Sequence, residues 1–153
     1  MKTILAAVDS SNMRDAVVAE AIALAGNGVG RVVLLTVVQP PMLTGEYAPV
    51  VENYAELLAA GERAAATLLG ETRQRIEAGG IAVDPVQASG APVAHILEHA
   101  ESHRADYIVM GSHGHTAFYD LLVGSTTHGV LLRAPCPVVI VPPRHKPARH
   151  GAR

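Results

Sequence analysis

The sequence of 153 residues is long enough for one domain with a buried core. Its formal net charge is −2, and acidic and basic residues are interspersed, so the body of the chain has no basic surface typical of nucleic-acid binding. No apolar stretch approaches the roughly 20 residues that span a bilayer, and the start lacks the pattern of a secretory signal. We therefore expect a cytoplasmic protein with neither a nucleic acid nor a membrane as partner. A domain over residues 1–143 is expected to precede a basic, disordered tail over residues 144–153.

Five runs of consecutive apolar residues alternate with amphipathic segments along the chain. Such runs are typical of parallel strands that helices cover on both faces. In chain order, we expect a strand over residues 3–8, a helix over 13–25, a strand over 31–38, a helix over 54–78 that stops at Gly79-Gly80, a strand over 81–88, a helix around 93–100, a strand over 106–111, a helix over 125–133 and a strand over 137–141. The alternation predicts a single-domain α/β fold with a doubly wound, open, parallel five-stranded sheet.

Pro85 lies inside the third expected strand and determines where that strand is placed. Proline has no N–H group for a ladder on both sides, so this strand is expected at an edge of the sheet. The strand order 3-2-1-4-5 follows, with the first and fourth strands adjacent where the winding reverses. Such sheets bind ligands in the crevice beyond the carboxyl ends of those two strands. Asp9 follows the first strand and Gly111 ends the fourth, so both are expected at this crevice.

The stretch "GSHGHTAFYDLLVGSTT", residues 111–127, holds three glycines and two groups of hydroxyl and imidazole side chains. Gly111 and Gly114 flank a tight exit from the fourth strand, where their missing side chains let the backbone take left-handed angles and let a ligand approach the main chain closely. Residues 124–127 stand at the start of the last expected helix, where unpaired N–H groups and a partial positive charge favour an anion such as phosphate. The alternative is structural: the first two glycines make a turn and Ser125 caps the helix.

The spacing Gly111-x2-Gly114-x9-Gly124-Ser125 resembles the ATP-binding signature of the universal stress protein family. The segments "ILAAVDSS", "VVLLTVV" and "PCPVVIVP" are similar to strands of that family. The likeness extends over about residues 3–142, nearly the whole chain. It implies that the anion is the phosphate chain of an adenine nucleotide.

The resemblance implies ATP as the cofactor and assigns residues to it. Asp9 and the backbone near Ala7 and Val37 would flank the adenosine, and Asp9 could hold Mg²⁺ through the bound nucleotide. Gly111 and Gly114 would lie near the ribose and phosphates. The implied nucleotide-binding residues are Ala7, Asp9, Val37, Met110, Gly111, His113, Gly114, Gly124, Ser125, Thr126 and Thr127.

Residues suited to ATP hydrolysis are few. The sequence contains no GxxxxGK[ST] loop, and its only lysines, Lys2 and Lys146, lie near the two ends. His113 could offer a donor at the crevice or serve only its loop, whereas His115 and His128 are interpreted as solvated structural residues. We therefore expect an ATP-binding regulatory protein of a stress response, with little or no turnover and no catalytic residues. The alternatives are a slow Mg²⁺-dependent ATPase and an interaction module without nucleotide.

Three histidines, His95, His99 and His103, recur every four residues in the third expected helix, beside Glu98. Adjacent pairs at this spacing can chelate a transition metal. Their directions lie off the apolar face of the helix, so we interpret them as a solvated polar flank and expect no metal site.

The last expected strand presents a plain apolar edge, with no interior proline or charge to protect it. Pairing with the same strand of a second copy would satisfy its backbone groups, and family members resemble this in dimerising through their last strand. We expect a homodimer through Val138, Val139, Ile140 and Val141, with an unknown regulatory protein as a further partner. The segment over 39–53 is either a mobile flap over the nucleotide or an ordinary connection.

Overall fold

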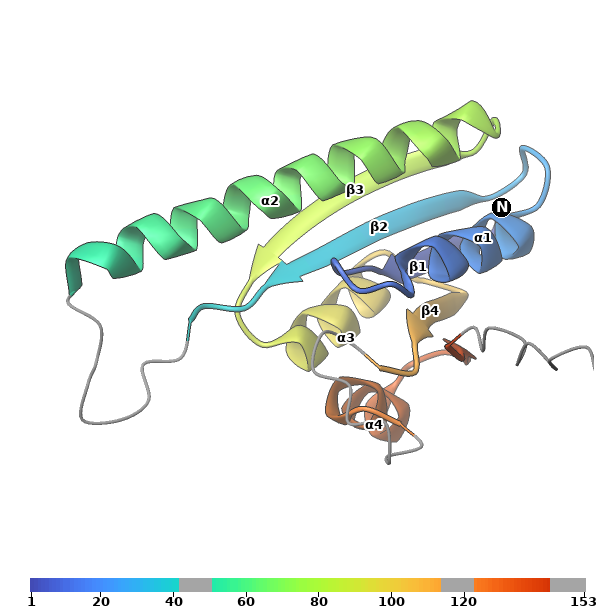
Figure 1. Cartoon of the computed structure of the whole chain (residues 1–153). Coiled ribbons are helices and arrows are strands. Elements are labelled where there is room, and N and C mark those ends of the chain that lie inside the picture. Colours follow the sequence, from blue (N-terminus) through green and yellow to red (C-terminus); the bar gives the residue numbers. More distant parts are fainter. Residues whose placement is uncertain (42–50, 114–122, 144–153) are drawn as a thin grey trace, which may run out of the picture.

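The computed structural model describes residues 1–41, 51–113 and 123–143 of the chain (Figure 1). The strands in these residues are β1 (Thr3–Ala7), β2 (Arg31–Val38), β3 (Ala82–Ser89), β4 (Tyr107–Gly111) and β5 (Val138–Val141). The helices are α1 (Arg14–Ala25), α2 (Val51–Ala78), α3 (Pro92–Ser102) and α4 (Ser125–Arg133). Each expected strand and helix is confirmed, with ends that differ by a few residues.

The strands form one parallel sheet in the order β3-β2-β1-β4-β5, as the sequence predicts. β1 is central, because Leu5 pairs with Val33 of β2 on one side and with Ile108 of β4 on the other. Pro85 of β3 pairs with Leu34 of β2. Because β3 is an edge strand, the missing N–H group of the proline is tolerated there. The winding therefore reverses between β1 and β4.

Helices cover both faces of the sheet (Figure 1). On one face, α1 and α2 pack on alternate residues of the central strands, among them Ile4 and Leu34. On the other face, α3 and α4 pack on the intervening residues, among them Leu5 and Ile108. All four of these side chains are fully buried, and each contributes about 1.5–3 kcal/mol relative to exposure. The continuous apolar runs in the sequence thus reflect two cores, one on each face.

The long helix α2 runs over β2 and β3 and extends past their carboxyl ends (Figure 1). It begins at Val51, three residues before the expected start, and ends before Gly79-Gly80 as predicted. Gly80 has a φ of 78°, a left-handed angle that glycine tolerates, and its N–H donates to the Glu77 carbonyl at 2.9 Å. The first buried side chain of α2 that the structure describes is Leu68, so the first half of the helix packs little.

Three sequence expectations concern residues outside the described ranges: the flap over 39–53 for the most part, Gly114 with His115, and the tail over 144–153. In the parts of the chain that are described, no helix combines the length and the apolar character needed to cross a membrane.

Candidate functional site

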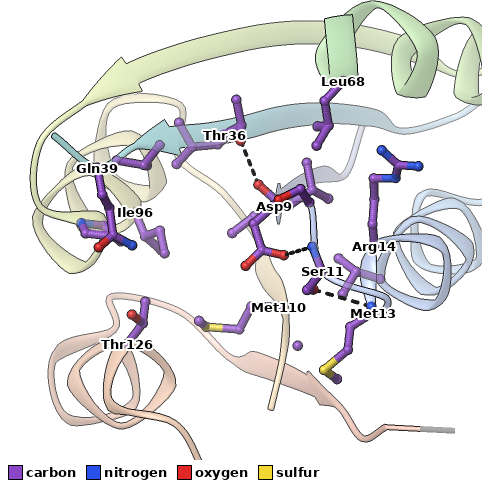
Figure 2. Close-up of a pocket in the computed structure, with 18 of the residues that line it drawn as sticks. Asp9, Ser11, Met13, Arg14, Thr36, Gln39, Leu68, Ile96, Met110 and Thr126 are labelled. Carbon is purple, nitrogen blue, oxygen red and sulfur yellow. Dashed lines mark hydrogen bonds between the residues drawn. The ribbon is translucent and has the colours of Figure 1, made fainter. Parts of the chain in front are cut away.

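A cavity of about 540 Å³ lies at the carboxyl ends of β1, β2 and β4 (Figure 2). Its walls come from the exits of these strands, from α1 and α2 on one side, and from the starts of α3 and α4 on the other. The structure brings together at this cavity the following residues singled out from the sequence: Ala7, Asp9, Val37, Met110, Gly111, His113, Gly124, Ser125, Thr126 and Thr127. Gly114, the remaining member of that set, lies outside the described residues.

Asp9 is held in a tight turn at the exit of β1. Its Oδ1 accepts a hydrogen bond of 2.9 Å from the Ser11 N–H, and the Ser11 Oγ accepts one of 3.3 Å from the Met13 N–H. The Thr36 hydroxyl donates to the Val8 carbonyl at 2.9 Å, which joins the ends of β1 and β2 beside this turn. Figure 2 shows the half-buried Asp9 side chain between Thr36 and Met110, so the turn presents its carboxylate to the cavity.

Gly111 stands at a close approach, and it does not take the left-handed angle that its missing side chain would allow. In the described chain, glycines with positive φ are found at 26, 28, 80 and 90. Gly111 instead continues β4, where it pairs with Val141. A Cβ atom on Gly111 would stand 3.1 Å from the Sδ and Cε atoms of Met13 and 3.3 Å from the His113 carbonyl oxygen. The missing side chain therefore lets the start of α1 pack directly against the end of β4.

The start of α4 is exposed to the cavity rather than capped by a hydroxyl. Gly124 is the N-cap residue, in an extended conformation, and no side-chain hydrogen bond caps the helix. The alternative in which Ser125 caps α4 is therefore wrong: Ser125 is already the first residue of the helix. The Gly124 N–H donates to the Ser112 carbonyl at 2.8 Å. The first-turn N–H groups that follow have no acceptor within the helix, so they can meet a ligand.

Thr127 lines the cavity but already has a hydrogen-bond acceptor for its hydroxyl. This residue is 2% exposed, and its Oγ1 donates to the Gly111 carbonyl at 2.8 Å. The bond fastens the first turn of α4 to the last residue of β4. Thr127 thus holds in place the main chain that Ser125 and Thr126 present to the cavity.

Among the described residues, Asp9 and Arg14 bring charged side chains to the cavity, and His113 adds an imidazole. Arg14 was not found from the sequence, where only lysines were considered as cations. The sequence feature that could have indicated Arg14 is its position. It lies five residues after Asp9, in the first turn of the helix that follows β1. Figure 2 shows Arg14 across the cavity from Thr126, with Asp9 between them. The cavity therefore has a positive side chain at one end and a helix N-terminus at the other.

An apolar wall from α2 was also missed. Gly61, Ala64, Ala65 and Leu68 of α2 line the cavity, and Figure 2 shows Leu68 at its upper edge. The small size of the first three leaves room beneath the helix, and the buried Leu68 joins this wall to the core. The sequence shows only an alanine-rich helix here, and nothing in its spacing indicates which residues face a ligand.

The histidines His95 and His99 of α3 and its C-cap residue His103 form a row outside the cavity, with the first pair stacked and the second tilted. Ring centroids are 6.3 Å apart for His95 and His99, and 5.5 Å apart for His99 and His103. The expected solvated flank is only partly exposed: all three residues are half-buried, and the Nδ1 atoms of His95 and His99 are enclosed without a hydrogen-bond partner, although a Glu98 carboxylate oxygen lies 3.7 Å from His95 Nδ1. Burial first, and the neighbouring His103 second, lower the pKa of His99. Within the described residues, no group of three or more His, Cys, Asp or Glu side chains could hold a metal ion. His128 is exposed, in agreement with its structural interpretation.

The parallel order with a cavity at the reversal point defines the chain as a doubly wound α/β protein with a ligand crevice. The model of the universal stress protein family matches residues 1–142. The chain therefore belongs to the universal stress protein family.

Individual relatives match to different extents. Universal stress protein MJ0531 of Methanocaldococcus jannaschii is 36% identical over 73 residues, which are 48% of this chain and 43% of that protein, so the match spans less than half of this curated relative. The structure of the hypothetical protein MJ0577 of the same organism superimposes with a TM-score of 0.81 at 28% identity, covering 95% of this chain and 98% of that one. A universal stress protein solved in complex with cAMP has the same fold, with a TM-score of 0.65 at 24% identity over 92% of this chain and 96% of that one.

Proposed function

We propose that this universal stress protein binds ATP in the cavity and acts as a nucleotide-dependent regulatory switch with little or no turnover. The observation that carries the proposal is the start of α4, which opens into the same cavity as Asp9 and Val37. First-turn N–H groups and the helix dipole stabilise a phosphate chain, and the opposite wall offers polar and apolar contacts for a nucleoside. One elongated anionic ligand with an uncharged end would therefore satisfy both walls.

The proposal assigns the cavity residues to two ends of the ligand. Ala7, Asp9 and Val37 would contact the adenosine, with Met110 and the α2 wall beside it. Gly111, His113, Gly114, Gly124, Ser125 and Thr126 would surround the ribose and phosphates. Thr127 would position Ser125 and Thr126 rather than contact the ligand, because its hydroxyl already donates a hydrogen bond to the Gly111 carbonyl.

Asp9 also fits a magnesium ion that arrives with the nucleotide. Mg²⁺ is commonly held by one carboxylate together with phosphate oxygens and water, and Asp9 offers such a carboxylate at the cavity. Bound Mg²⁺ would neutralise part of the phosphate charge. Arg14 lies at the other end of the cavity from α4, so its positive charge would favour an anionic ligand across the cavity rather than through contact with the phosphates.

Low turnover is proposed from the residues that line the cavity. Among those that the structure describes, Asp9 is the one carboxylate and no lysine is present. Hydrolysis needs a group that orients the attacking water and charges that stabilise the transition state, and this set offers little of either. The alternative, a slow Mg²⁺-dependent ATPase, predicts several turnovers per minute that Asp9→Ala abolishes. Release of phosphate measured with both proteins separates the two functions.

We also propose a cytoplasmic homodimer that pairs through Val138–Val141, with nucleotide occupancy read by an unidentified regulatory protein. β5 is an edge strand, and all four of its side chains are only half-buried in the single chain. An apolar edge of this kind is stabilised by pairing with another strand. Sedimentation at micromolar concentration measures the state directly, and a monomer there would contradict the dimer. The role in a stress response is inferred from family membership.

Calorimetry with two ligands tests the nucleotide site. In Gly124→Val, the Cβ atom would stand 3.3 Å from the Ser112 carbonyl oxygen and 3.6 Å from the His113 Cα, so the valine would displace the start of α4 from the phosphates. We expect at least about tenfold weaker ATP binding. Adenosine has no phosphates, so its affinity is expected to change little. Gly70→Val on the open face of α2, where a Cβ atom meets nothing within 4 Å, is the matched control and should bind both ligands normally.

The outcome against the proposal is equally specific. Wild-type protein that binds neither ATP nor ADP would rule out the site, and equal affinity of wild type and Gly124→Val for ATP would rule out α4 as the phosphate anchor. Native mass spectrometry of the purified protein then tests the alternative of an interaction module without nucleotide, because co-purified adenine nucleotide would count against that alternative.

A further inference from the structure

We propose that Gly129 is a positioning residue that fixes the start of α4 at the cavity through its contact with Val93 of α3. The effect of Gly129 on the position of α4 does not depend on any ligand. Its effect on ATP affinity rests on the proposed function. Gly129 lies in the second turn of the nine-residue helix α4, and Val93 lies in the first turn of α3. Both helices begin at the cavity and stand side by side on one face of the sheet (Figure 1).

The contact leaves no room for a side chain at position 129. A Cβ atom built on Gly129 would stand 2.9 Å from the Cγ2 and 3.3 Å from the Cγ1 of Val93. Both are shorter than an ordinary contact between carbon atoms, which is about 3.5–4.0 Å. Valine in a helix has one strongly preferred rotamer, so Val93 cannot easily turn its methyl groups aside. The backbone of α4 therefore rests directly on this side chain.

A glycine inside a short helix is otherwise unfavourable, which makes the expected effect of alanine specific to the site. Alanine has the highest helix propensity, so Gly→Ala in an open helix stabilises it. Gly70 in α2 is such a position, because a Cβ atom there meets nothing within 4 Å. At Gly129 the same substitution gains propensity but forces α4 away from α3. The two glycines thus form a matched pair that separates helix propensity from helix position.

Displacement of α4 reaches the cavity because the helix is also held on its other side. Thr127 lies two residues before Gly129 in α4, and its hydroxyl donates a hydrogen bond of 2.8 Å to the Gly111 carbonyl. A helix pushed away from Val93 must stretch this bond or tilt about it. Either movement shifts the N–H groups of Ser125 and Thr126, two residues that line the cavity together with Pro92 of α3. Gly129 and Val93 together therefore set the width of the cavity at the proposed phosphate end.

Amide spectra of the ligand-free protein test the inference without nucleotide. We expect Gly129→Ala to shift the ¹H–¹⁵N signals of Gly124, Ser125 and Thr126, and the double variant with Val93→Ala to return them toward wild type. Val93 is distant in the sequence, so this return would not occur if the new methyl group acted only on its own neighbours in α4. Gly70→Ala should leave the three signals in place.

ATP titration gives the second measurement. Gly129→Ala is expected to weaken ATP binding about tenfold, because a helix shift of a fraction of an ångström misplaces several donors at once. Adding Val93→Ala should recover most of that loss, and Gly70→Ala should bind as wild type. If wild type does not bind ATP, the proposed function fails, and the amide signals still decide the inference.

Results that overturn the inference are distinct from failure to fold. Unchanged amide signals in Gly129→Ala, or changed signals that Val93→Ala does not reverse, would contradict it. If Gly129→Ala unfolds, recovery of a folded protein in the double variant supports the contact, and an unfolded double variant contradicts it.

Discussion

The hydroxyl of Thr127 donates a 2.8 Å hydrogen bond to the carbonyl of Gly111, and this bond joins the start of α4 to the end of β4. A second link runs parallel to it, from the Gly124 N–H to the Ser112 carbonyl at 2.8 Å. Together they hold the start of α4 against the end of β4. At this end, the cavity is therefore shaped by these two hydrogen bonds in addition to the packing of α4 on α3.

Replacing Thr127 with valine isolates the first of these links, because the shape is kept and the donor is lost. We expect Thr127→Val to lower the free energy of unfolding by about 1–2 kcal/mol, since the Gly111 carbonyl loses a partner in a partly buried place. Urea unfolding measures this difference. Thr67→Val is the control: the Thr67 hydroxyl also donates to a backbone carbonyl, that of Arg63, but on an exposed surface of α2. An equal loss of unfolding free energy in both variants would show that the hydrogen bond to Gly111 contributes no more than an exposed one.

The Arg14 side chain is expected to strengthen the binding of anionic ligands through its charge. We expect Arg14→Gln to weaken ATP binding roughly two- to fivefold at low salt, with a smaller effect at high salt, because a partly exposed charge is screened. The variant also removes the 3.8 Å ion pair between Arg14 and Asp15, but Asp15 keeps its 2.6 Å ion pair with Arg75. Calorimetry at two ionic strengths measures the effect. Arg73→Gln, which removes an exposed cation of α2 bonded to Glu77, should leave ATP affinity unchanged.

The histidine row predicts a loss of stability in acid. Burial lowers the pKa of His99 below its ordinary value of 6.5, His103 and His95 lower it further, and Glu98 opposes the shift. The folded state therefore binds the proton more weakly than the unfolded state, so this part of the stability is full above pH 6.5 and is lost as the pH falls from there through the lowered pKa of the folded state. His99→Gln should flatten this part of the pH profile. Chemical unfolding between about pH 5 and pH 8 measures it, and an identical slope in both proteins would contradict the assignment.

The fold could be predicted from the sequence because its signals are redundant. Consecutive apolar runs such as Val32–Leu35 indicate strands buried on both faces, and Pro85 places one strand at the edge. The cavity position followed from the strand order, which brings Asp9 and Gly111 to the same crevice. These inferences depend on periodicity and chain order, which a single sequence contains.

Details that depend on distances across the fold could not be predicted. The sequence relates Gly111 to a left-handed angle, whereas the structure shows that its missing side chain makes room for Met13. Met13 lies near the other end of the sequence, so this contact has no local signal. The α2 wall and Arg14 were missed because nothing in their local sequence points at a ligand. Similarly, the half-buried histidines were expected in solvent, since helix periodicity gives the direction of a side chain but not what covers it.

Asp9 can be tested by a substitution that keeps its turn. In Asp9→Asn, the amide oxygen can still accept the 2.9 Å hydrogen bond from the Ser11 N–H, so the variant removes charge and leaves the turn in place. If Asp9 accepts hydrogen bonds from the adenosine, binding of adenosine and of ATP should each weaken about tenfold or more, with or without Mg²⁺, because hydrogen bonds to a charged acceptor are worth about 1.5–3 kcal/mol.

A metal role gives a different pattern in the same titrations. If Asp9 acted only through Mg²⁺, adenosine binding would be unchanged, and ATP binding would weaken only when Mg²⁺ is present, because the carboxylate repels the phosphates when no cation lies between them. Four titrations of wild type and variant, with adenosine and ATP and with Mg²⁺ or EDTA, separate these cases. We expect the adenosine pattern, since Asp9 lies at the exit of β1, across the cavity from the start of α4. A loss of affinity that is confined to ATP with Mg²⁺ would contradict contact of Asp9 with the adenosine and would indicate that Asp9 acts at the phosphates.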